Sequence, residues 1–405
     1  MQLPPSPAQR RIALLTYISP LQKWGSAQRS RHLIDALLRH GAVDVVVLRF
    51  DRRGAEAPPV SVSDFHGARV IEIGVTVGGL PSRPRFDLAS DHVTRTVEQH
   101  VDLKSYDLFV SRYVKPALKL RLPPQAPVVV DFDDAVYEPP WRALSTPKMW
   151  VGAFTRLLND RLLVRMRLAC RPHAHYFFCR EAERRHFPAL PGSVLPNLPA
   201  APARPGPPSF DTPARPALMF VGLLDYMPNT DAVDWFLADI WPRVRAAVPD
   251  ARFLIVGSGA DELLARWRAH AGVETLGFVD SLADAYAQAT ASVVPMRGGA
   301  GTNIKALEPF HYGRPVIATR QVLEGYDSLF RDGQDMLAAD DARTFAEHCI
   351  ALLDNPARAR ELARSGYQRL STHLTTEHFG SILDSAVTPL LSGGGSSMAS
   401  HASRP

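Results

Sequence analysis

Residues 293–308 read VVPMRGGAGTNIKALE. The first of them continue an apolar strand that starts at Ala291, and the glycines that follow predict a tight loop. After the loop we expect a helix that carries Lys305 and Glu308, and then a buried strand, RPVIAT, at residues 314–319. Glycines allow backbone N–H groups to approach an anion closely, and a helix N-terminus adds partial positive charge. This order of elements suits a nucleotide that carries a diphosphate.

The loop matches neither of the two common phosphate-binding fingerprints. A P-loop requires Lys-Ser or Lys-Thr after its last glycine, whereas Gly301 is followed by Thr302 and Asn303. The dinucleotide fingerprint requires a third glycine, and Ile304 occupies that position. A glycine-rich turn also serves as a plain connection wherever φ must be positive. The rest of the sequence has to decide between a phosphate site and a simple turn.

The composition predicts a globular protein with room for two domains. Of 405 residues, 46% are hydrophobic and 21% are charged, which are ordinary values for a chain with a hydrophobic core. The three cysteines show neither a disulfide framework nor a metal-binding spacing, which is typical of a protein from a reducing cytosol. Residues 1–11 lack the apolar core of a signal peptide, and no run of about 18 apolar residues predicts a membrane span. We therefore expect a cytoplasmic location.

The net charge of +5 favours an anionic partner. The segment 153–171 interleaves apolar residues with five arginines. One interpretation is a core helix with a solvated basic face. The other is a basic amphipathic helix that attaches the protein peripherally to an anionic surface on the inner face of the membrane. Scattered arginines without interleaved aromatic residues or a binding motif argue against nucleic acid as the partner.

Strands and helices alternate in two successive blocks. Apolar runs at residues 11–16, 43–48 and 127–132 predict buried strands in the first block, and runs at 217–221 and 252–256 restart the pattern in the second. The helices expected between strands include those near 27–39, 231–248 and 302–312. Continuous apolar strands separated by helical segments are typical of parallel sheets covered by helices on both faces. The sequence therefore predicts an α/β protein with two doubly wound, Rossmann-like domains. Ligands of such domains bind at the carboxyl ends of the strands, so we expect a site in the cleft between the two.

The second block resembles the retaining group 1 glycosyltransferases, also called family 4, which have the GT-B fold. Their motifs occur in order here as FVG at 220–222, YMPN at 226–229, DAVDWF at 231–236, IWP at 240–242, PDA at 249–251, LIVG at 254–257, GFVD at 277–280, VPM at 294–296, the stretch 299–308 and GRPV at 313–316. In the first block, the loop WGSAQR at residues 24–29 stands where these enzymes have a phosphate-side loop. The resemblance implies a GT-B fold with a C-terminal helix that crosses back to the first domain.

With this resemblance, we expect six consecutive parts. They are a flexible N-terminus at 1–10, an acceptor-side Rossmann-like domain at 11–198, a linker at 199–216, a nucleotide-sugar-binding domain at 217–372, a crossover helix at 373–390 and a disordered tail at 391–405. The linker contains seven prolines and little apolar periodicity, as expected for a stiff, exposed connection. The tail contains SGGGSS at residues 392–397, a composition typical of disorder.

The resemblance also implies a reaction. A hexose would move from a UDP- or GDP-linked sugar to a hydroxyl of a glycan or lipid-linked acceptor, in the biosynthesis of a polysaccharide, glycolipid or other glycoconjugate. The anomeric configuration would be kept, and no metal or other cofactor would be required. Lys305 would neutralise the diphosphate leaving group, and Glu308 would hold the ribose hydroxyls. The nucleotide-binding residues implied are Gly25, Ser26, Arg297, Gly298, Gly299, Gly301, Thr302, Lys305 and Glu308.

Two positions depart from the family pattern. Many relatives have a glutamate at the position of Ala300 that contacts the donor sugar. Many also have an arginine at the position of Leu223 that binds phosphate, and Arg297 is our candidate to supply that charge. These differences leave a non-catalytic GT-B scaffold open as an alternative, and a sugar-nucleotide epimerase of the same fold is a second one.

The sequence DFDD at residues 131–134 follows a predicted strand. It resembles the Asp-x-Asp metal motif of the other large glycosyltransferase fold, GT-A, but aspartates are common in turns after strands. We expect no metal there. We interpret Asp133 as a candidate catalytic residue that faces the substrate.

Overall fold

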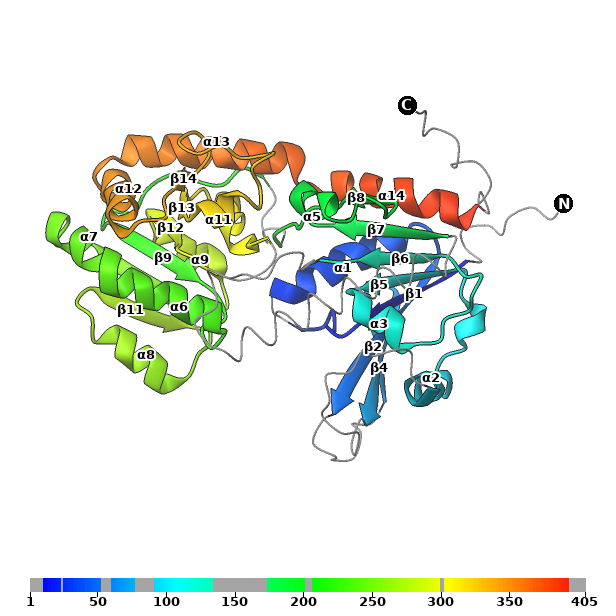
Figure 1. Ribbon diagram of the computed structural model, residues 1–405. Helices are drawn as coiled ribbons and strands as arrows, with labels where there is room; N and C mark the ends of the chain where they lie inside the picture. The colour runs from blue at the N-terminus through cyan, green and yellow to red at the C-terminus, as the bar shows by residue number, and fades with distance from the viewer. Residues whose placement is uncertain are drawn as a thin grey trace, which may run out of the picture. The chain divides into compact units, whose positions relative to one another are not determined.

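The computed structural model describes residues 10–22, 25–51, 60–76, 91–133, 173–200, 206–298 and 302–392. The chain forms two compact units (Figure 1). The first contains the described residues up to Asn197 together with those from Thr376 onward, and the second contains the described residues from Leu198 to Thr375. The predicted basic helix at 153–171, the N-terminal residues 1–9 and the tail from 393 lie outside the described residues.

The first unit is built on a sheet with the strand order β3-β4-β2-β1-β5-β6-β7-β8. Its strands are β1 (Arg11–Thr16), β2 (Ala42–Asp51), β3 (Ser61–Phe65), β4 (Ala68–Thr76), β5 (Leu108–Arg112), β6 (Val128–Asp131), β7 (Ala174–Phe178) and β8 (Gly192–Val194). Neighbouring strands run parallel, except for the antiparallel pair β3 and β4. The strand order reverses between β1 and β5, whose apolar residues are buried because helices cover the sheet.

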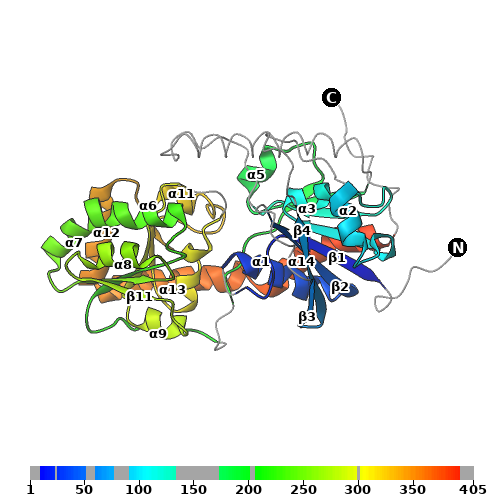
Figure 2. The ribbon, with the colours of Figure 1, turned by 90° about the horizontal axis from the view of Figure 1, so that it is seen from below.

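The helices of the first unit are α1 (Gly25–Leu37), α2 (Asp91–Glu98), η2 (Leu103–Ser105), α3 (Val114–Lys119), α5 (Glu181–Arg185) and α14 (Thr376–Leu391). The C-terminal helix α14 packs on α1 (Figure 2). At this contact Asp384 accepts hydrogen bonds from Arg39 and lies 2.7 Å from Nε2 of His40. The prediction that a C-terminal helix returns to the first domain is therefore confirmed.

The second unit is built on an all-parallel sheet with the order β11-β10-β9-β12-β13-β14. Its strands are β9 (Ala217–Val221), β10 (Arg252–Val256), β11 (Val273–Gly277), β12 (Ala291–Val294), β13 (Val316–Ala318) and β14 (Leu337–Ala338). In chain order this is the 3-2-1-4-5-6 arrangement of a Rossmann domain, with the switch point between β9 and β12. The predicted α/β class with two parallel sheets is confirmed.

The helices of the second unit follow the predicted spacing with two differences. They are α6 (Met227–Trp235), η3 (Phe236–Ile240), α7 (Trp241–Ala247), α8 (Asp261–Arg268), α9 (Leu282–Ala287), η4 (Ile304–Ala306), α10 (Glu308–His311), α11 (Arg320–Leu323), α12 (Ala342–Asp354) and α13 (Pro356–His373). The helix predicted at 231–248 begins four residues earlier, with Pro228 in its first turn, and contains a π-helical segment ahead of Pro242. Proline has no N–H to donate within a helix, which explains both positions.

The second difference concerns the helix predicted at 302–312. It is divided into the single 3₁₀ turn η4 and the short helix α10. Pro309 cannot donate a hydrogen bond to the preceding turn, so the α-helical ladder cannot run through this segment. The division places Lys305 and Glu308 on two short elements rather than on one long helix face.

Residues 206–216 of the predicted linker belong to the second unit. Nη1 of Arg314 donates a hydrogen bond to the backbone oxygen of Asp211 at 2.6 Å. A Cβ at Gly313 would lie 2.2 Å from the backbone oxygen of Ser209. The segment is thus held to the domain that follows it.

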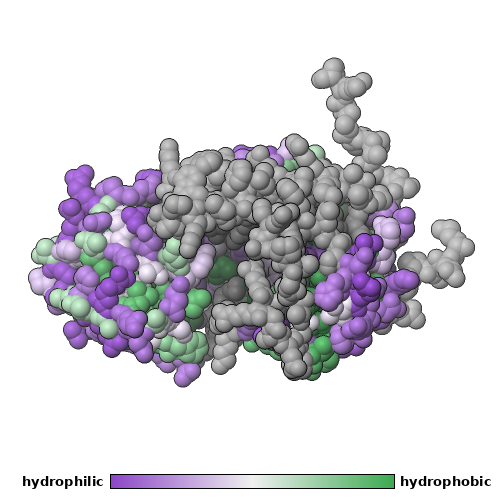
Figure 3. All heavy atoms as spheres, turned by 60° about the horizontal axis from the view of Figure 1, so that its bottom comes forward, coloured by the Kyte–Doolittle hydropathy of each residue, from purple (hydrophilic) through white to green (hydrophobic). Residues whose placement is uncertain are grey.

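The described surface is largely hydrophilic in the view of Figure 3. Its exposed large apolar side chains are Leu21, Val60, Val62, Leu223, Tyr226, Met227 and Phe278. Within the described ranges, no helix has the length and apolar character that a bilayer crossing requires.

Candidate functional site

The candidate site of the second unit lies at the carboxyl ends of β9 and β12, the two strands that flank the switch point. β9 continues through Gly222 into the loop that precedes α6, and β12 continues into the glycine-rich stretch that precedes η4. Open α/β sheets bind ligands at this place because the connections leave the sheet in opposite directions there. The topology therefore brings together residues far apart in the chain, in particular Asn229 and Lys305.

Lys305 is the positive charge of this site. Its Nζ donates a hydrogen bond to Oδ1 of Asn229, lies 3.7 Å from Sδ of Met296 and lies 5.2 Å from the centroid of the Phe220 ring. Burial lowers the pKa of Lys305 from 10.5 to about 8, although the charge of Glu308 opposes this shift. In the described part of the chain, no carboxylate forms an ion pair with Lys305. The groups that hold the ammonium directly are neutral, so its charge remains able to attract an anion.

Glu308 begins α10 and is held by a tyrosine. Its Oε1 accepts a hydrogen bond of 3.0 Å from the hydroxyl of Tyr286, a fully buried residue whose ring stacks on Tyr312 at 4.7 Å. Burial raises the pKa of Glu308, against the opposing effects of the Tyr286 hydrogen bond and the Lys305 charge. The arrangement orients one carboxylate oxygen through the protein, so the other is placed to accept hydrogen bonds from a ligand.

The predicted phosphate loop is only partly described. Gly299, Ala300 and Gly301 lie outside the described residues, whereas Gly298 ends the preceding segment and Thr302 is buried at the start of the next.

Arg297 is engaged by other side chains. Its Nη2 donates to Oδ1 of Asp231 at 2.8 Å, and its guanidinium lies 5.0 Å from the centroid of the Trp235 ring. Both members of the ion pair are nearly half exposed. The charge that we expected to replace the family's phosphate-binding arginine is thus paired with a carboxylate, while Leu223, at the arginine position, is exposed.

Gly25 and Ser26, predicted in a loop, form the first turn of α1. The loop interpretation of residues 24–29 is therefore wrong for most of its length, because the helix begins two residues before the predicted start at Ala27. The first N–H groups of a helix have no partner within the helix. The backbone of Gly25 and Ser26 is accordingly still suited to face an anion.

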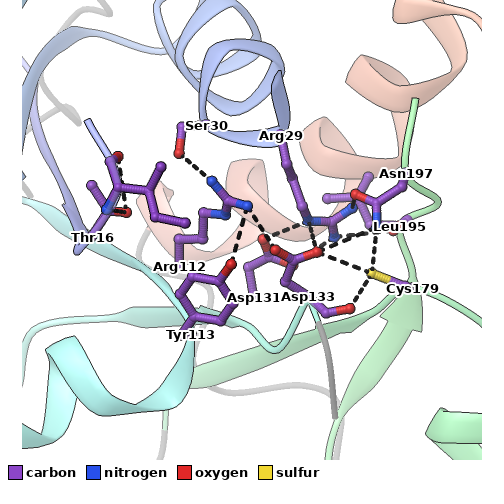
Figure 4. A network of polar contacts seen from close by, with 11 residues as sticks. Thr16, Arg29, Ser30, Arg112, Tyr113, Asp131, Asp133, Cys179, Leu195 and Asn197 are labelled. Carbon is purple, nitrogen blue, oxygen red and sulfur yellow. Dashed lines mark hydrogen bonds and ion pairs between the residues drawn. The ribbon is translucent and has the colours of Figure 1, made fainter. Parts of the chain in front are cut away.

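Asp133 belongs to a buried network in the first unit (Figure 4). Its Oδ2 accepts a hydrogen bond of 2.7 Å from Nη2 of Arg112, and its Oδ1 lies 3.8 Å from Nε of Arg29 and 3.3 Å from Nδ2 of Asn197. Arg29 in turn forms a bidentate pair with Asp131, with distances of 2.7 and 2.5 Å. These side chains come from α1 and from the carboxyl ends of β5, β6 and β8. No local motif in the sequence indicates the network.

The network determines what Asp133 can do chemically. Burial by itself would raise its pKa, but the charges of Arg112 and Arg29 outweigh burial and hold the pKa well below its usual range. Asp133 also has a φ of 56°, an uncommon conformation outside glycine. A carboxylate with so low a pKa is a poor proton acceptor, so a role in catalysis would be electrostatic or positioning.

Across the residues that the structure describes, no group of three or more His, Cys, Asp or Glu side chains is placed to hold a metal ion. Asp134, the last residue of the DFDD sequence, lies outside them.

Comparison with known protein families gives a match in the second unit. Residues 215–355 match the family model described as glycosyl transferases group 1. The matched stretch runs from β9 to α12 of the second unit. Asn229, Tyr286, Lys305 and Glu308 all lie within it, so the switch-point cluster and the family match coincide.

Individual relatives extend the comparison. This chain is 27% identical over 159 residues to an uncharacterised 44.6 kDa protein from the cps region of Klebsiella pneumoniae, a match that covers 37% of this chain and 40% of that protein. Sucrose-phosphate synthase from Thermosynechococcus elongatus superposes with a TM-score of 0.65 at 16% identity, covering 95% of this chain and all of the other. TarM of S. aureus superposes with a TM-score of 0.64 at 11% identity, covering 94% of this chain and 99% of the other. These likenesses show the GT-B fold.

Proposed function

We propose that the protein is a retaining glycosyltransferase that transfers a hexose from a nucleoside-diphosphate sugar to an acceptor hydroxyl without a metal ion. The observation that carries this proposal is the partly buried Lys305 ammonium, which neutral groups hold beside Glu308 at the switch point of the unit that matches the group 1 glycosyltransferase family. The TarM structure contains UDP, which supports a UDP-linked donor over a GDP-linked one. The relative from a cps region supports a role in polysaccharide biosynthesis.

Lys305 would stabilise the leaving group. When the bond between the anomeric carbon and the diphosphate oxygen breaks, negative charge builds up on the diphosphate. A buried ammonium stabilises this charge more strongly than a solvated one, because little water screens it. The backbone N–H groups near Gly298 and Thr302 would add to this stabilisation.

Glu308 would bind the donor in the ground state. Its carboxylate would accept hydrogen bonds from the ribose hydroxyls, with Tyr286 holding the side chain in place. A contact of this kind forms equally in the ground state and the transition state, so it strengthens donor binding more than it raises the chemical rate.

The low pKa of Asp133 supports a front-side displacement. The acceptor oxygen would attack the anomeric carbon on the face that the diphosphate leaves, directly or through a short-lived ion pair. The acceptor proton would pass to the departing diphosphate oxygen. No protein base is needed for this step, and the configuration at the anomeric carbon is kept. Asp133 would contribute through its fixed negative charge or its effect on neighbouring side chains.

The acceptor would be a glycan or a lipid-linked glycan bound on the side of the first unit. The basic segment 153–171 would hold the protein peripherally at the cytoplasmic face of a membrane, close to a lipid-linked acceptor.

The test uses a panel of UDP-, GDP- and ADP-sugars with the full chain, free of divalent metal. We expect hydrolysis or transfer with a UDP-hexose, calorimetric binding of UDP, and an α-linked product from an α-linked donor in the NMR spectrum. Formation of an isomerised sugar nucleotide from donor alone would instead indicate an epimerase. Failure to bind either UDP or GDP would indicate a non-catalytic scaffold.

A further inference from the structure

Asn229 connects the two loops that form the switch-point site. It lies on α6, is 3% exposed, and uses both ends of its side-chain amide. Oδ1 accepts the hydrogen bond from Nζ of Lys305, and Nδ2 donates a bond of 2.8 Å to the backbone oxygen of Leu223. The bond to Leu223 determines the orientation of the amide, because only the nitrogen can donate to a carbonyl. The oxygen is therefore directed at Lys305.

Gly222 leaves the space that this amide occupies. A Cβ at Gly222 would lie 2.8 Å from Nδ2 of Asn229 and 3.3 Å from the Phe220 ring. Gly222 is not among the residues with positive φ, so its backbone does not require glycine. The requirement is for room beside Asn229 and Phe220, two of the groups that contact Lys305.

We propose that Asn229 is the positioning residue of Lys305, which directs the ammonium towards the diphosphate and keeps it charged without neutralising it. The inference rests on the proposed function and extends it to a residue that does not itself touch the donor. A buried ammonium needs a hydrogen-bond acceptor. An aspartate would supply one, but its negative charge would cancel the attraction for the diphosphate. An amide oxygen accepts the bond without adding a further negative charge beside Lys305.

The first experiment measures the titration of Lys305 directly, in the full chain without donor. Competitive labelling with an amine-reactive reagent at a series of pH values, read by mass spectrometry, gives the protonation midpoint of Lys305. Asn229→Leu removes the acceptor and keeps the volume, so the midpoint should fall by about one pH unit. Asn229→Asp places a carboxylate against the ammonium, so the midpoint should rise by about one unit. The charge of Glu308 also acts on Lys305, and Glu308 is unchanged in all these variants.

Thr230→Val is the matched control. Thr230 neighbours Asn229 on α6, and its hydroxyl donates a 2.7 Å bond to the backbone oxygen of Leu224 in the same loop, without contacting Lys305. Its substitution should leave the Lys305 midpoint and the transfer rate unchanged. If Asn229 only secures the loop, all three variants should behave alike, and the opposite shifts expected of leucine and aspartate would not occur.

The second experiment measures transfer. Loss of a hydrogen bond to a charged group should lower kcat about 10- to 100-fold in Asn229→Leu, with a smaller change in the donor KM. Asn229→Asp should also be slower, but with its alkaline limb moved to higher pH. Gly222→Ala, which displaces the amide, should have an intermediate kcat.

The outcomes separate the two proposals. Equal Lys305 midpoints in the wild type and both Asn229 variants would overturn the positioning role, whatever the activity. Opposite shifts in a protein that transfers no sugar would support the positioning role and reject the proposed function. Melting curves of each variant identify a failure to fold, and the isosteric Asn229→Asp remains informative if Asn229→Leu does not fold.

Discussion

The hydroxyl of Tyr286 lies 3.0 Å from Oε1 of Glu308 and donates a hydrogen bond to it. The two residues are 22 positions apart, on α9 and at the start of α10. Tyr286 is fully buried and its ring stacks on Tyr312, so the hydroxyl has little freedom to move. The orientation of Glu308 therefore depends on a residue that lies behind the site.

Tyr286→Phe should weaken UDP binding without changing the fold. The variant keeps the stacked ring and removes only the hydrogen bond, which is worth about 1.5–3 kcal/mol when one partner is charged. We expect the Kd for UDP, measured by calorimetry, to rise roughly tenfold. Tyr312→Phe is the control, since it keeps the same stack without removing that bond. Equal affinities in the wild type and Tyr286→Phe would show that Glu308 does not need this support.

UDP affinity should depend on the protonation of Glu308. Burial raises the pKa of this carboxyl above its ordinary value of 4.5. Above its pKa, the group is a carboxylate that accepts hydrogen bonds from hydroxyls. As pH falls through the raised pKa, the carboxylate is lost, so affinity should decrease at a higher pH than an unperturbed glutamate would cause. Glu308→Gln should bind UDP more weakly and lose this acid-side dependence, as measured by calorimetry at several pH values.

Lys305→Ala should reduce transfer strongly. Removal of one group that stabilises transition-state charge costs about 10²- to 10³-fold in kcat. In the wild type, the ammonium is present below its pKa of about 8 and is lost as pH rises through that value, so kcat should fall on the alkaline side. Lys305→Arg keeps a charge at all these pH values, so its remaining activity should lack the alkaline fall. A wild-type rate that is flat from pH 7 to 10 would contradict the assignment.

Arg112→Met should destabilise the first unit. Arg112 and Asp133 form a buried pair at 2.7 Å, and removal of one partner leaves an uncompensated charge. Breaking a buried pair costs about 3–5 kcal/mol, measurable as a shift in the denaturant midpoint. The partner substitution Asp133→Asn in the same background should recover part of the loss. Additive effects in this double-mutant cycle would show that the pair contributes little.

The same network predicts how stability depends on pH. The pKa of Asp133 is depressed in the folded protein, so its contribution to stability is present above its unfolded pKa near 3.8 and is lost as pH falls towards the folded value. Asp133→Asn should therefore be less stable than the wild type at pH 7. The gap between the two proteins should narrow below about pH 4, which urea titrations at both pH values would reveal.

The central strands could be predicted from the sequence because they are continuous apolar runs. β1, β9, β10 and β12 coincide with predicted strands, since burial on both faces requires apolar residues at consecutive positions. The edge strands β3 and β11 were missed because they are partly exposed and carry polar residues that hide the pattern. The division of the helix after Lys305 was also missed, although Pro309 is a visible signal for it.

The motif order around Lys305 and Glu308 is local in the sequence, so the family, the fold and the nucleotide-binding candidates could be inferred from it. The side chains that set the charge and orientation of these two residues could not. Asn229 is 76 positions from Lys305, and the Arg29–Asp131 pair spans 102 positions. Such contacts exist only because parallel strands bring their carboxyl ends to one edge of a sheet, where residues from separate βα units meet. Residue type and local spacing thus identified the candidate groups, while burial and partners, which depend on the folded sheets, decided their pKa values and geometry.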